Sequence, residues 1–428
     1  MIPLKSHRFS VTHLAGPNMF NTGIVLAALI HISVAQELLY DLVNSILVPK
    51  LKSDFAKNNV SAQWAPSYPK EWGSEDLQFQ FNDPMPDEVF SGVLTDDGRY
   101  LAMLNGTHVR FLDIDLNTTV TTFSLGLPAN YAAQHLVVRS TPEGGYDVFA
   151  DGAKPLISVD SVFRRQLYPD LTLTSETPIA YKGALGTFSK QGKMALTPGS
   201  IHDLNTPNSP AIILEGQTSV TDLNFNPNGT LLSTVNWNLR TADLWNATTG
   251  AKIFAFPDAK AQNWRTLFSP DGKYIAIALG SGNRSIQIYA TENLAAKPIT
   301  LTGFKDWPRV LEWSQSSSFL AVGDPGRLQV FGVPDGTVLQ TWELESTNNG
   351  VYSVDDVHWV DGDRKILFAF RYAVYVYDFE KNLKRWITPR VTDHMWTEQN
   401  LKVRVGEGEG DGILVSGDPD GVARGWKL

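Results

Sequence analysis

Short runs of alternating hydrophobic and polar residues fill most of this chain, and clusters of turn-forming residues separate them. The segment NFNPNGTLLSTVNWNLRTADLWNATTG, residues 224–250, contains three such runs joined by two turns. Alternation over about four to eight residues is typical of half-buried β-strands, and an Asn-Gly pair between two runs is typical of a tight hairpin. The segment therefore predicts three antiparallel strands, with a fourth in the AKIFAFPD that follows.

The same arrangement recurs 43 residues later, in the runs WRTLFSPDGK, YIAIALGSGN, RSIQIYATEN and AAKPITLTG. Each such unit has an apolar residue near the end of its first strand, before a turn that is usually rich in glycine. These residues are Leu94, Val138, Phe188, Phe225, Phe268, Trp313, Trp359 and Val405. Each unit also has a residue pair that closes its third strand. These pairs are Leu112-Asp113, Val159-Asp160, His202-Asp203, Trp245-Asn246, Tyr289-Ala290, Phe331-Gly332, Tyr377-Asp378 and Trp426-Lys427.

Successive closing pairs lie 42 to 49 residues apart. A period of roughly 40–45 residues with four strands per unit is the signature of β-propeller blades. One unit is too small a sheet to be stable alone, whereas units stacked around an axis bury their faces on one another. The sequence therefore predicts an all-β fold, a single β-propeller of eight four-stranded blades over residues 75–428. Seven blades is the alternative, if the weak unit at Val138 or at Phe188 is irregular.

The end of the repeat region predicts how the ring closes. The last unit, LKVRVGEGEGDGILVSGDPDGVARGWKL, provides only three strands. The missing strand is expected from EDLQFQFND, Glu75–Asp83, where apolar and polar residues alternate. A strand supplied from the N-terminal side closes the ring and leaves no free sheet edge.

Two motifs in these units resemble the WD40 repeat family. FSPDGKYIAIA and ADLWNATTG are similar to the FSPDG and LWD-x-x-TG signatures of that family, although no unit holds a Trp-Asp pair. The resemblance covers roughly residues 75–428 and is strongest in the units of Phe225, Phe268 and Trp313. It implies a propeller that acts as an interaction platform. It also implies that the loops entering each first strand, and those joining second and third strands, lie on one face around the central channel.

The first 74 residues show other patterns. Lys5 and Arg8 stand in an N-terminal stretch without acids, the apolar run GIVLAALIHISVA follows, and Ser33-Val34-Ala35 offers small residues for cleavage. These features predict a signal peptide over residues 1–35. The apolar run is too short for a membrane span, which needs ~18–20 residues. QELLYDLVNSILVPKL then has apolar residues at helical spacing, so residues 36–74 are expected to form a short amphipathic helix and a linker. In the competing interpretation, the leader is only part of a helix.

Composition and charge exclude some classes of function and favour others. A net charge of −9 and a pI near 5.4 argue against nucleic-acid binding, and the absence of cysteine excludes disulfides and thiolate sites. Six Asn-x-Ser/Thr sequons favour a secreted glycoprotein, and five of them fall in predicted turns of the repeat region. The sequons are Asn59, Asn105, Asn117, Asn228, Asn246 and Asn283.

Large aromatic residues, two of them next to arginines, recur at the loop face that the resemblance implies. Such residues favour a stacking platform for a peptide, protein or carbohydrate ligand. The competing interpretation is that they only cover the blade ends. The candidate ligand-binding residues are Trp237, Trp264, Arg265, Trp307, Arg309, Tyr352 and Trp396. By contrast Trp245, Trp313, Trp359 and Trp426 lie within strands and are expected in the core.

No catalytic motif, metal-ligand spacing or cofactor motif is found in the sequence. Aspartates in the loops between second and third strands, Asp151, Asp324 and Asp418, are expected to bond backbone donors and neighbouring side chains. His135 and His394 lie near entries to first strands and are expected to be hydrogen-bonding loop residues.

The sequence therefore favours a secreted, N-glycosylated, non-catalytic binding module without cofactor, metal or membrane span. The first alternative is a secreted propeller enzyme acting on a lactone or carbohydrate, which would need clustered acids and histidines with perturbed pKa values at the channel mouth. The second is an intracellular WD40 scaffold whose sequons stay unmodified.

Overall fold

The computed structural model describes most of the repeat region and little of the chain before it. The described residues are 63–64, 66, 78–81, 85, 89, 91–153, 159, 161–218, 220–257, 259–280, 282–343, 354–370, 373–387, 400–404, 412–417 and 422–428. They belong to one compact unit, Val48–Leu428. The predicted signal peptide, the predicted amphipathic helix, Asn59, Tyr352, His394, Trp396 and Asp418 lie outside the described residues.

The described strands form eight antiparallel blades, numbered here in chain order. Blade 1 contains β3 (Ser91–Leu94), β4 (Tyr100–Leu104), β5 (His108–Asp113) and β6 (Thr118–Ser124); blade 2 contains β7 (Leu136–Ser140), β8 (Tyr146–Gly152), β9 (Ser161–Leu167) and β10 (Ile179–Lys182). Blade 3 contains β11 (Ala184–Phe188), β12 (Lys193–Thr197), β13 (Ser200–Asp203) and β14 (Ile212–Ile213); blade 4 contains β15 (Asp222–Phe225), β16 (Leu231–Asn236), β17 (Thr241–Asn246) and β18 (Lys252–Ala255).

The second half of the propeller follows the same order. Blade 5 contains β19 (Asn263–Phe268), β20 (Tyr274–Leu279), β21 (Ser285–Ala290) and β22 (Ile299–Leu301); blade 6 contains β23 (Val310–Trp313), β24 (Phe319–Asp324), β25 (Arg327–Gly332) and β26 (Val338–Glu343). Blade 7 contains β27 (Val354–Val360), β28 (Lys365–Phe370), β29 (Ala373–Asp378) and β30 (Leu383–Ile387); blade 8 contains β31 (Asn400–Arg404), β32 (Ile413–Gly417) and β33 (Ala423–Lys427).

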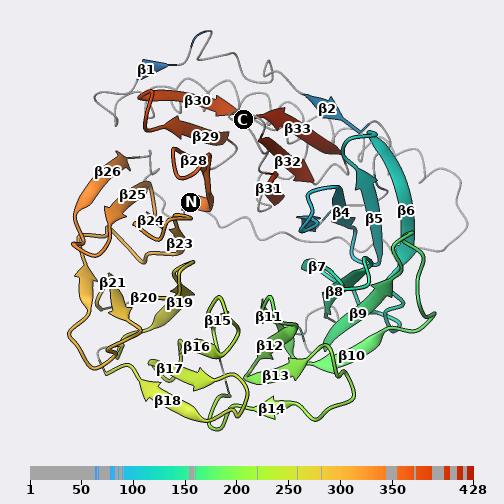
Figure 1. Cartoon of the computed structure of the whole chain (residues 1–428), viewed down its shortest axis with the longest axis horizontal. Helices are drawn as coiled ribbons and strands as arrows, with labels where there is room; N and C mark the ends of the chain where they lie inside the picture. The colour runs from blue at the N-terminus through green and yellow to red at the C-terminus, as the bar shows by residue number, and fades with distance from the viewer. Residues whose placement is uncertain are drawn as a thin grey trace, which may run out of the picture. The chain divides into compact units, whose positions relative to one another are not determined.

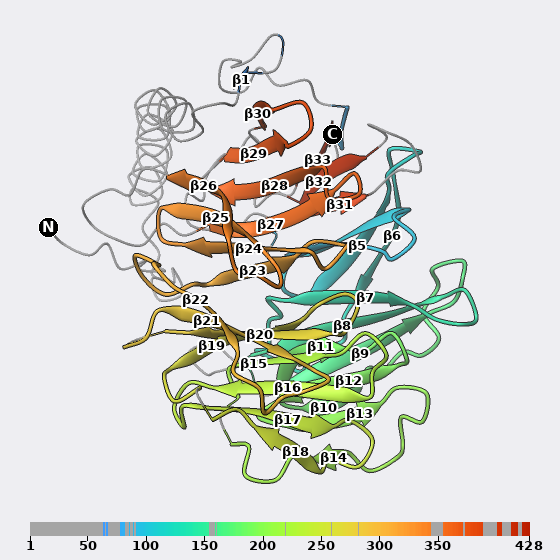
Figure 2. The same ribbon diagram turned by 60° about the vertical axis from the view of Figure 1, so that its left-hand side comes forward.

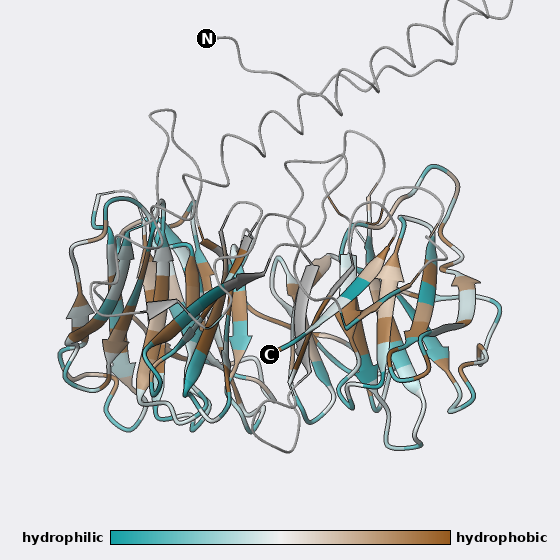
Figure 3. Ribbon diagram, turned by 90° about the horizontal axis from the view of Figure 1, so that it is seen from above, coloured by the Kyte–Doolittle hydropathy of each residue, from teal (hydrophilic) through white to brown (hydrophobic). Residues whose placement is uncertain are grey.

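The blades surround a central axis, with the first strand of each blade near the axis and the last at the outside (Figure 1). The views in Figures 2 and 3 show the sheets side by side around that axis, with apolar residues concentrated along the strands. The all-β propeller of eight blades is thus confirmed, and the seven-bladed alternative is wrong because the units at Val138 and Phe188 each form a complete four-stranded sheet.

The predicted closing strand is also confirmed. Residues Phe79–Gln80 form β2, which pairs antiparallel with β33 and gives blade 8 its fourth strand. A second, unpredicted contribution comes from β1 (Gln63–Trp64), which pairs in parallel with β30 and extends blade 7 to five strands. A strand of two residues carries no alternation that a sequence pattern could reveal.

One predicted strand end is wrong. Val159-Asp160 was expected to close the third strand of blade 2, but this pair precedes that strand, which is β9 and ends at Leu167. The connection from β8 to β9 is longer than in the other blades, so a fixed period places the strand too early. The other seven pairs end third strands as expected.

Packing between neighbouring blades forms the core. The four tryptophans expected in the core are buried, with exposed fractions of 1% to 5%. Two of them also bridge blades: the indole Nε1–H of Trp359 donates to the carbonyl of Glu312 at 3.2 Å, and that of Trp313 donates to the carbonyl of Leu267 at 3.3 Å. Each bridge joins a first strand to the first strand of the preceding blade, which fixes the spacing of blades around the channel.

The closing strand depends on a glycine that lies opposite it. Phe79 pairs with Gly425, and a Cβ added at Gly425 would lie 2.1 Å from the Phe79 ring. That ring packs edge-on against Phe81 at 5.4 Å, which restricts its movement. We expect Gly425→Ala to lower the free energy of unfolding by roughly 1–3 kcal/mol, because overpacking a fixed ring forces strain. Chemical denaturation measures this.

The double variant Phe79→Ala/Gly425→Ala provides the control for the Gly425→Ala prediction. Once the ring is removed, the added methyl group has room, so Gly425→Ala should cost little in the Phe79→Ala background. An equal cost in both backgrounds would show that the clash is not the cause.

Candidate functional site

Three of the predicted aromatic residues lie at one end of three consecutive blades. Trp237 directly follows β16 in blade 4, Trp264 is the second residue of β19 in blade 5, and Trp307 precedes β23 in blade 6. In antiparallel blades the second strand ends and the first strand begins at the same end, so all three side chains come from that end. All three are half-buried.

The three indole rings contact one another, and we call them the tryptophan cluster. The ring centroids of Trp237 and Trp307 lie 4.6 Å apart and those of Trp237 and Trp264 lie 5.2 Å apart, both edge to face. Trp264 and Trp307 lie 6.4 Å apart. Gly280, in the β20–β21 loop, permits this approach: a Cβ there would lie 3.4 Å from the ring of Trp307 and 3.0 Å from the carbonyl oxygen of Gln262.

Arg309 joins the tryptophan cluster. Its guanidinium carbon lies 5.8 Å from the ring centroid of Trp264 and 5.9 Å from that of Trp307. Its backbone N–H donates to the carbonyl of Gly323 at 2.9 Å, which fixes the residue at the start of β23. The side chain is half-buried, and its Nε is fully buried with no hydrogen-bond acceptor in the described part of the chain.

Arg265 behaves differently from Arg309. It is exposed, and its Nε lies 4.0 Å from the Asp222 carboxylate on β15. That carboxylate also accepts a hydrogen bond from the Thr266 N–H at 2.9 Å, and its burial raises its pKa while Arg265 opposes the rise. Arg265 therefore has an acidic partner in the wall of blade 4. The structure thus groups Trp237, Trp264, Trp307 and Arg309, and directs Arg265 towards Asp222.

A second group of ionisable residues lies on the inner strands of blades 6 and 7, and sequence reasoning missed its central member. Burial, assisted by the charge of Asp356, raises the pKa of Glu312 on β23 to about 7, while His358 and Arg265 oppose the rise. On β27, His358 Nε2 lies 3.2 Å from the Asp356 carboxylate. No motif marks Glu312 in the sequence, because its environment is built by residues from other blades.

Asp151 on β8 and Asp324 at the end of β24 lie in second strands rather than in the predicted loops, but they bond backbone donors and neighbouring side chains as expected. Asp151 accepts hydrogen bonds from the backbone N–H groups of Gln134 and His135, at 3.1 and 2.9 Å, and its carboxylate lies 2.5 Å from His135 Nδ1. Asp324 accepts a hydrogen bond from the Lys305 N–H at 2.6 Å and another from Arg327 Nη2 at 2.9 Å. Each carboxylate thus links the residues that precede a first strand to the end of a second strand.

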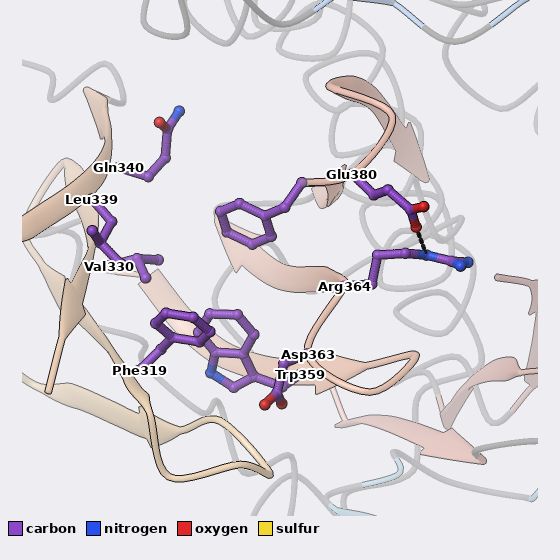
Figure 4. Close-up of a pocket in the computed structure, with 9 residues that line it drawn as sticks. Phe319, Val330, Leu339, Gln340, Trp359, Asp363, Arg364 and Glu380 are labelled. Atoms are coloured by element: carbon purple, nitrogen blue, oxygen red, sulfur yellow. Dashed lines mark ion pairs between the residues drawn. The ribbon is translucent and has the colours of Figure 1, made fainter.

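A groove between blades 6 and 7 was not predicted (Figure 4). Its volume is about 390 Å³, and its wall contains a stack of Phe319, Trp359 and Phe379, with ring centroids 5.8 Å apart at each step. Leu339 lies opposite, and Arg364 forms an ion pair with Glu380 at 3.3 Å at the rim. The groove is lined by residues from the ends of the blades opposite to the tryptophan cluster.

The described residues offer neither a metal site nor a membrane-crossing helix. Within these segments, no group of three or more histidine, aspartate or glutamate side chains is arranged to hold a metal ion. The same segments contain no helix with the length and apolarity that crossing a bilayer requires.

Comparison with known proteins identifies the fold and nothing finer. No protein-family model matches the chain, and no curated protein matches its sequence. Among solved structures, it is similar to Saccharomyces cerevisiae Sqt1, with a TM-score of 0.63 and 14% identity, over 83% of this chain and 99% of Sqt1. It is also similar to the computationally designed protein Ika8, with a TM-score of 0.57 and 15% identity, over 81% of this chain and 98% of Ika8. These similarities support the β-propeller fold.

The raised pKa of Glu312 predicts that the stability of the fold depends on pH. Its pKa near 7 in the folded state exceeds the ordinary value of 4.5. Between these values the unfolded chain releases a proton that the folded chain retains, so the free energy of unfolding falls as pH rises. Between about pH 4.5 and 8, we expect the free energy of unfolding of the wild type to fall by roughly 1–3 kcal/mol relative to that of Glu312→Gln. Denaturant titrations of both proteins across this range measure the difference, and a difference independent of pH would contradict the raised pKa.

Proposed function

We propose that this chain is a non-catalytic binding module and that its ligand or partner binds on the tryptophan cluster. The observation that carries the proposal is the meeting of three half-buried indoles from three consecutive blades at one end of the sheets. The tryptophans that serve the core are nearly fully buried. Half-exposed indoles that are fixed by one another offer a rigid apolar surface with N–H donors, which is typical of the centre of a binding site.

The fold supports this proposal only in a general way. A propeller places loops from all blades at two ends, so residues distant in sequence converge on one surface. Because many unrelated functions occur on one fold, the function must be inferred from the residues of the site itself. The class of partner is a peptide, a protein or a carbohydrate, each of which can stack against indole rings.

Removing two indoles provides the test of the binding site. We expect Trp264→Ala/Trp307→Ala to lose at least about tenfold in affinity for peptide-array or glycan-array members that the wild type binds, because central aromatic contacts carry most binding energy. Tyr168→Ala is the matched control, since Tyr168 is exposed in blade 2 at the opposite end of the sheets. Unfolding curves confirm that both variants are folded. Unchanged affinity in the double variant would place the binding site elsewhere.

Secretion and N-glycosylation form a second part of the proposal. The leader pattern and the sequons support it. Of the described sequons, Asn117, Asn228 and Asn283 are exposed, whereas Asn105 and Asn246 are half-buried. Asn246 is the last residue of β17 rather than a turn residue, and its side-chain oxygen accepts hydrogen bonds from the N–H groups of Thr248 and Thr249.

Burial predicts which described sequons carry glycans. Expressed in a eukaryotic secretory host, the chain should appear in the medium beginning at Gln36, with higher glycan occupancy at Asn117, Asn228 and Asn283 than at Asn105 and Asn246. A glycan needs space around the asparagine Nδ2 atom, which exposed turns provide. Mass spectrometry before and after glycosidase treatment measures both. A retained chain with Met1 intact and no glycan would support the intracellular scaffold instead.

A second candidate function is favoured by Glu312. A carboxyl group with a pKa near neutrality, on the strand beside a His358–Asp356 pair, is the arrangement that general acid–base chemistry uses. This observation favours a propeller enzyme acting on a lactone or a carbohydrate in the channel. Glu312→Gln separates the two functions, because it would abolish turnover while leaving binding that depends on the tryptophan cluster intact.

A further inference from the structure

Arg309 is a half-buried cation whose charge has no anionic partner in the described part of the chain. Among the side chains that the structure describes, no carboxylate forms an ion pair with its guanidinium, and its Nε is buried without an acceptor. Burying part of a cation without an anion or a full set of acceptors is unfavourable. Two other arginines at this end have acidic neighbours: Arg265 lies near Asp222, and Arg284 lies 3.9 Å from Asp306.

The surroundings of Arg309 hold its guanidinium in place. The rings of Trp264 and Trp307 both lie within 6 Å of it, and Trp237 packs against both rings. An arginine fixed in this way loses little side-chain entropy when it binds, and its planar fork matches the two oxygens of a carboxylate. Because Arg309 itself lies over two of the rings, the tryptophan cluster is not open to a cationic ligand at that position.

We propose that Arg309 and the tryptophan cluster form a carboxylate-binding site, and that the ligand carries its carboxylate next to a flat apolar group. This inference rests on the proposed binding function and specifies its chemistry. The carboxylate pairs with the terminal guanidinium nitrogens, and the apolar group lies against the exposed parts of the indoles. A monoanion fits better than a phosphate dianion, because Arg309 is one cation and Asp222 and Asp306 lie at the same end of the blades.

Three probes that share a phenyl ring test this chemistry: N-acetyl-phenylalanine, its uncharged amide, and phenyl phosphate. The full chain is labelled with 5-fluorotryptophan, and the fluorine signals of Trp237, Trp264 and Trp307 are assigned by Trp→Phe substitutions. We expect the carboxylate probe to shift the Trp264 and Trp307 signals saturably, and the amide to bind roughly tenfold or more weakly, because it lacks the charge-assisted hydrogen bonds.

Two arginine variants complete the test. Arg309→Gln should reduce the affinity for N-acetyl-phenylalanine to the affinity that the wild type has for the amide. Arg240→Gln, which removes an exposed arginine from the β16–β17 loop at the same end, should leave it unchanged. Fluorine signals that keep the wild-type dispersion show that both variants are folded.

The outcomes separate this inference from the proposed function. Equal affinity for carboxylate and amide, with shifts confined to the tryptophan cluster, would overturn the carboxylate site and leave the binding site standing. Tighter binding of phenyl phosphate would assign the site to phosphate instead and overturn the proposal. If no probe shifts these signals, the carboxylate site is wrong, while the array experiment with the double tryptophan variant still decides the proposed function.

Discussion

Every part of this molecule depends on the burial of blade faces against neighbouring blades. A four-stranded sheet of this size cannot bury enough apolar surface by itself, so each blade obtains its stability from contacts on both sides. The contacts between blades 6 and 7 show how this works. Trp342 on β26 has its ring centroid 5.4 Å from that of Phe368 and 5.3 Å from that of Tyr377 in the next blade. For every blade to have such contacts on both sides, the ring must be closed, because in an open ring each of the two terminal blades would have one uncovered face.

The same constraint explains where the candidate site lies. Side chains along the strands pack against neighbouring blades. The residues that are not needed for this packing lie at the strand ends, where loops of adjacent blades meet. The tryptophan cluster arises at such a meeting point, and no single blade could form it. The candidate site therefore lies at boundaries between repeats rather than within any one repeat unit.

Much of the fold was available in the sequence, because the period and the strand alternation are local properties. The closing strand was predictable for the same reason, since Glu75–Asp83 alternates and the last unit lacks a strand. The third strand of blade 2 was misplaced because loop length is not encoded in the period. The two-residue β1 was invisible because its pairing with β30 involves backbone groups without a side-chain pattern.

The site was only partly predictable. The sequence placed Trp264, Trp307 and their neighbouring arginines at one face, but it did not distinguish Arg265 from Arg309. Arg309 lies near the rings of Trp264 and Trp307, whereas Arg265 is adjacent to Trp264 and lies near Asp222, a difference that depends on residues of other blades. Glu312 gave no signal, because its raised pKa comes from burial that only the assembled ring produces.

The pairing of β2 with β33 has a consequence for biosynthesis. β33 is the last described strand of the propeller, and blade 8 has no fourth strand until β33 pairs with a segment made hundreds of residues earlier. During translation the early blades can pack as they emerge, but the ring stays open until β33 has left the ribosome. A chain that ends before β33 would keep exposed strand edges, which favour aggregation. Closure of the ring therefore requires that translation reach β33.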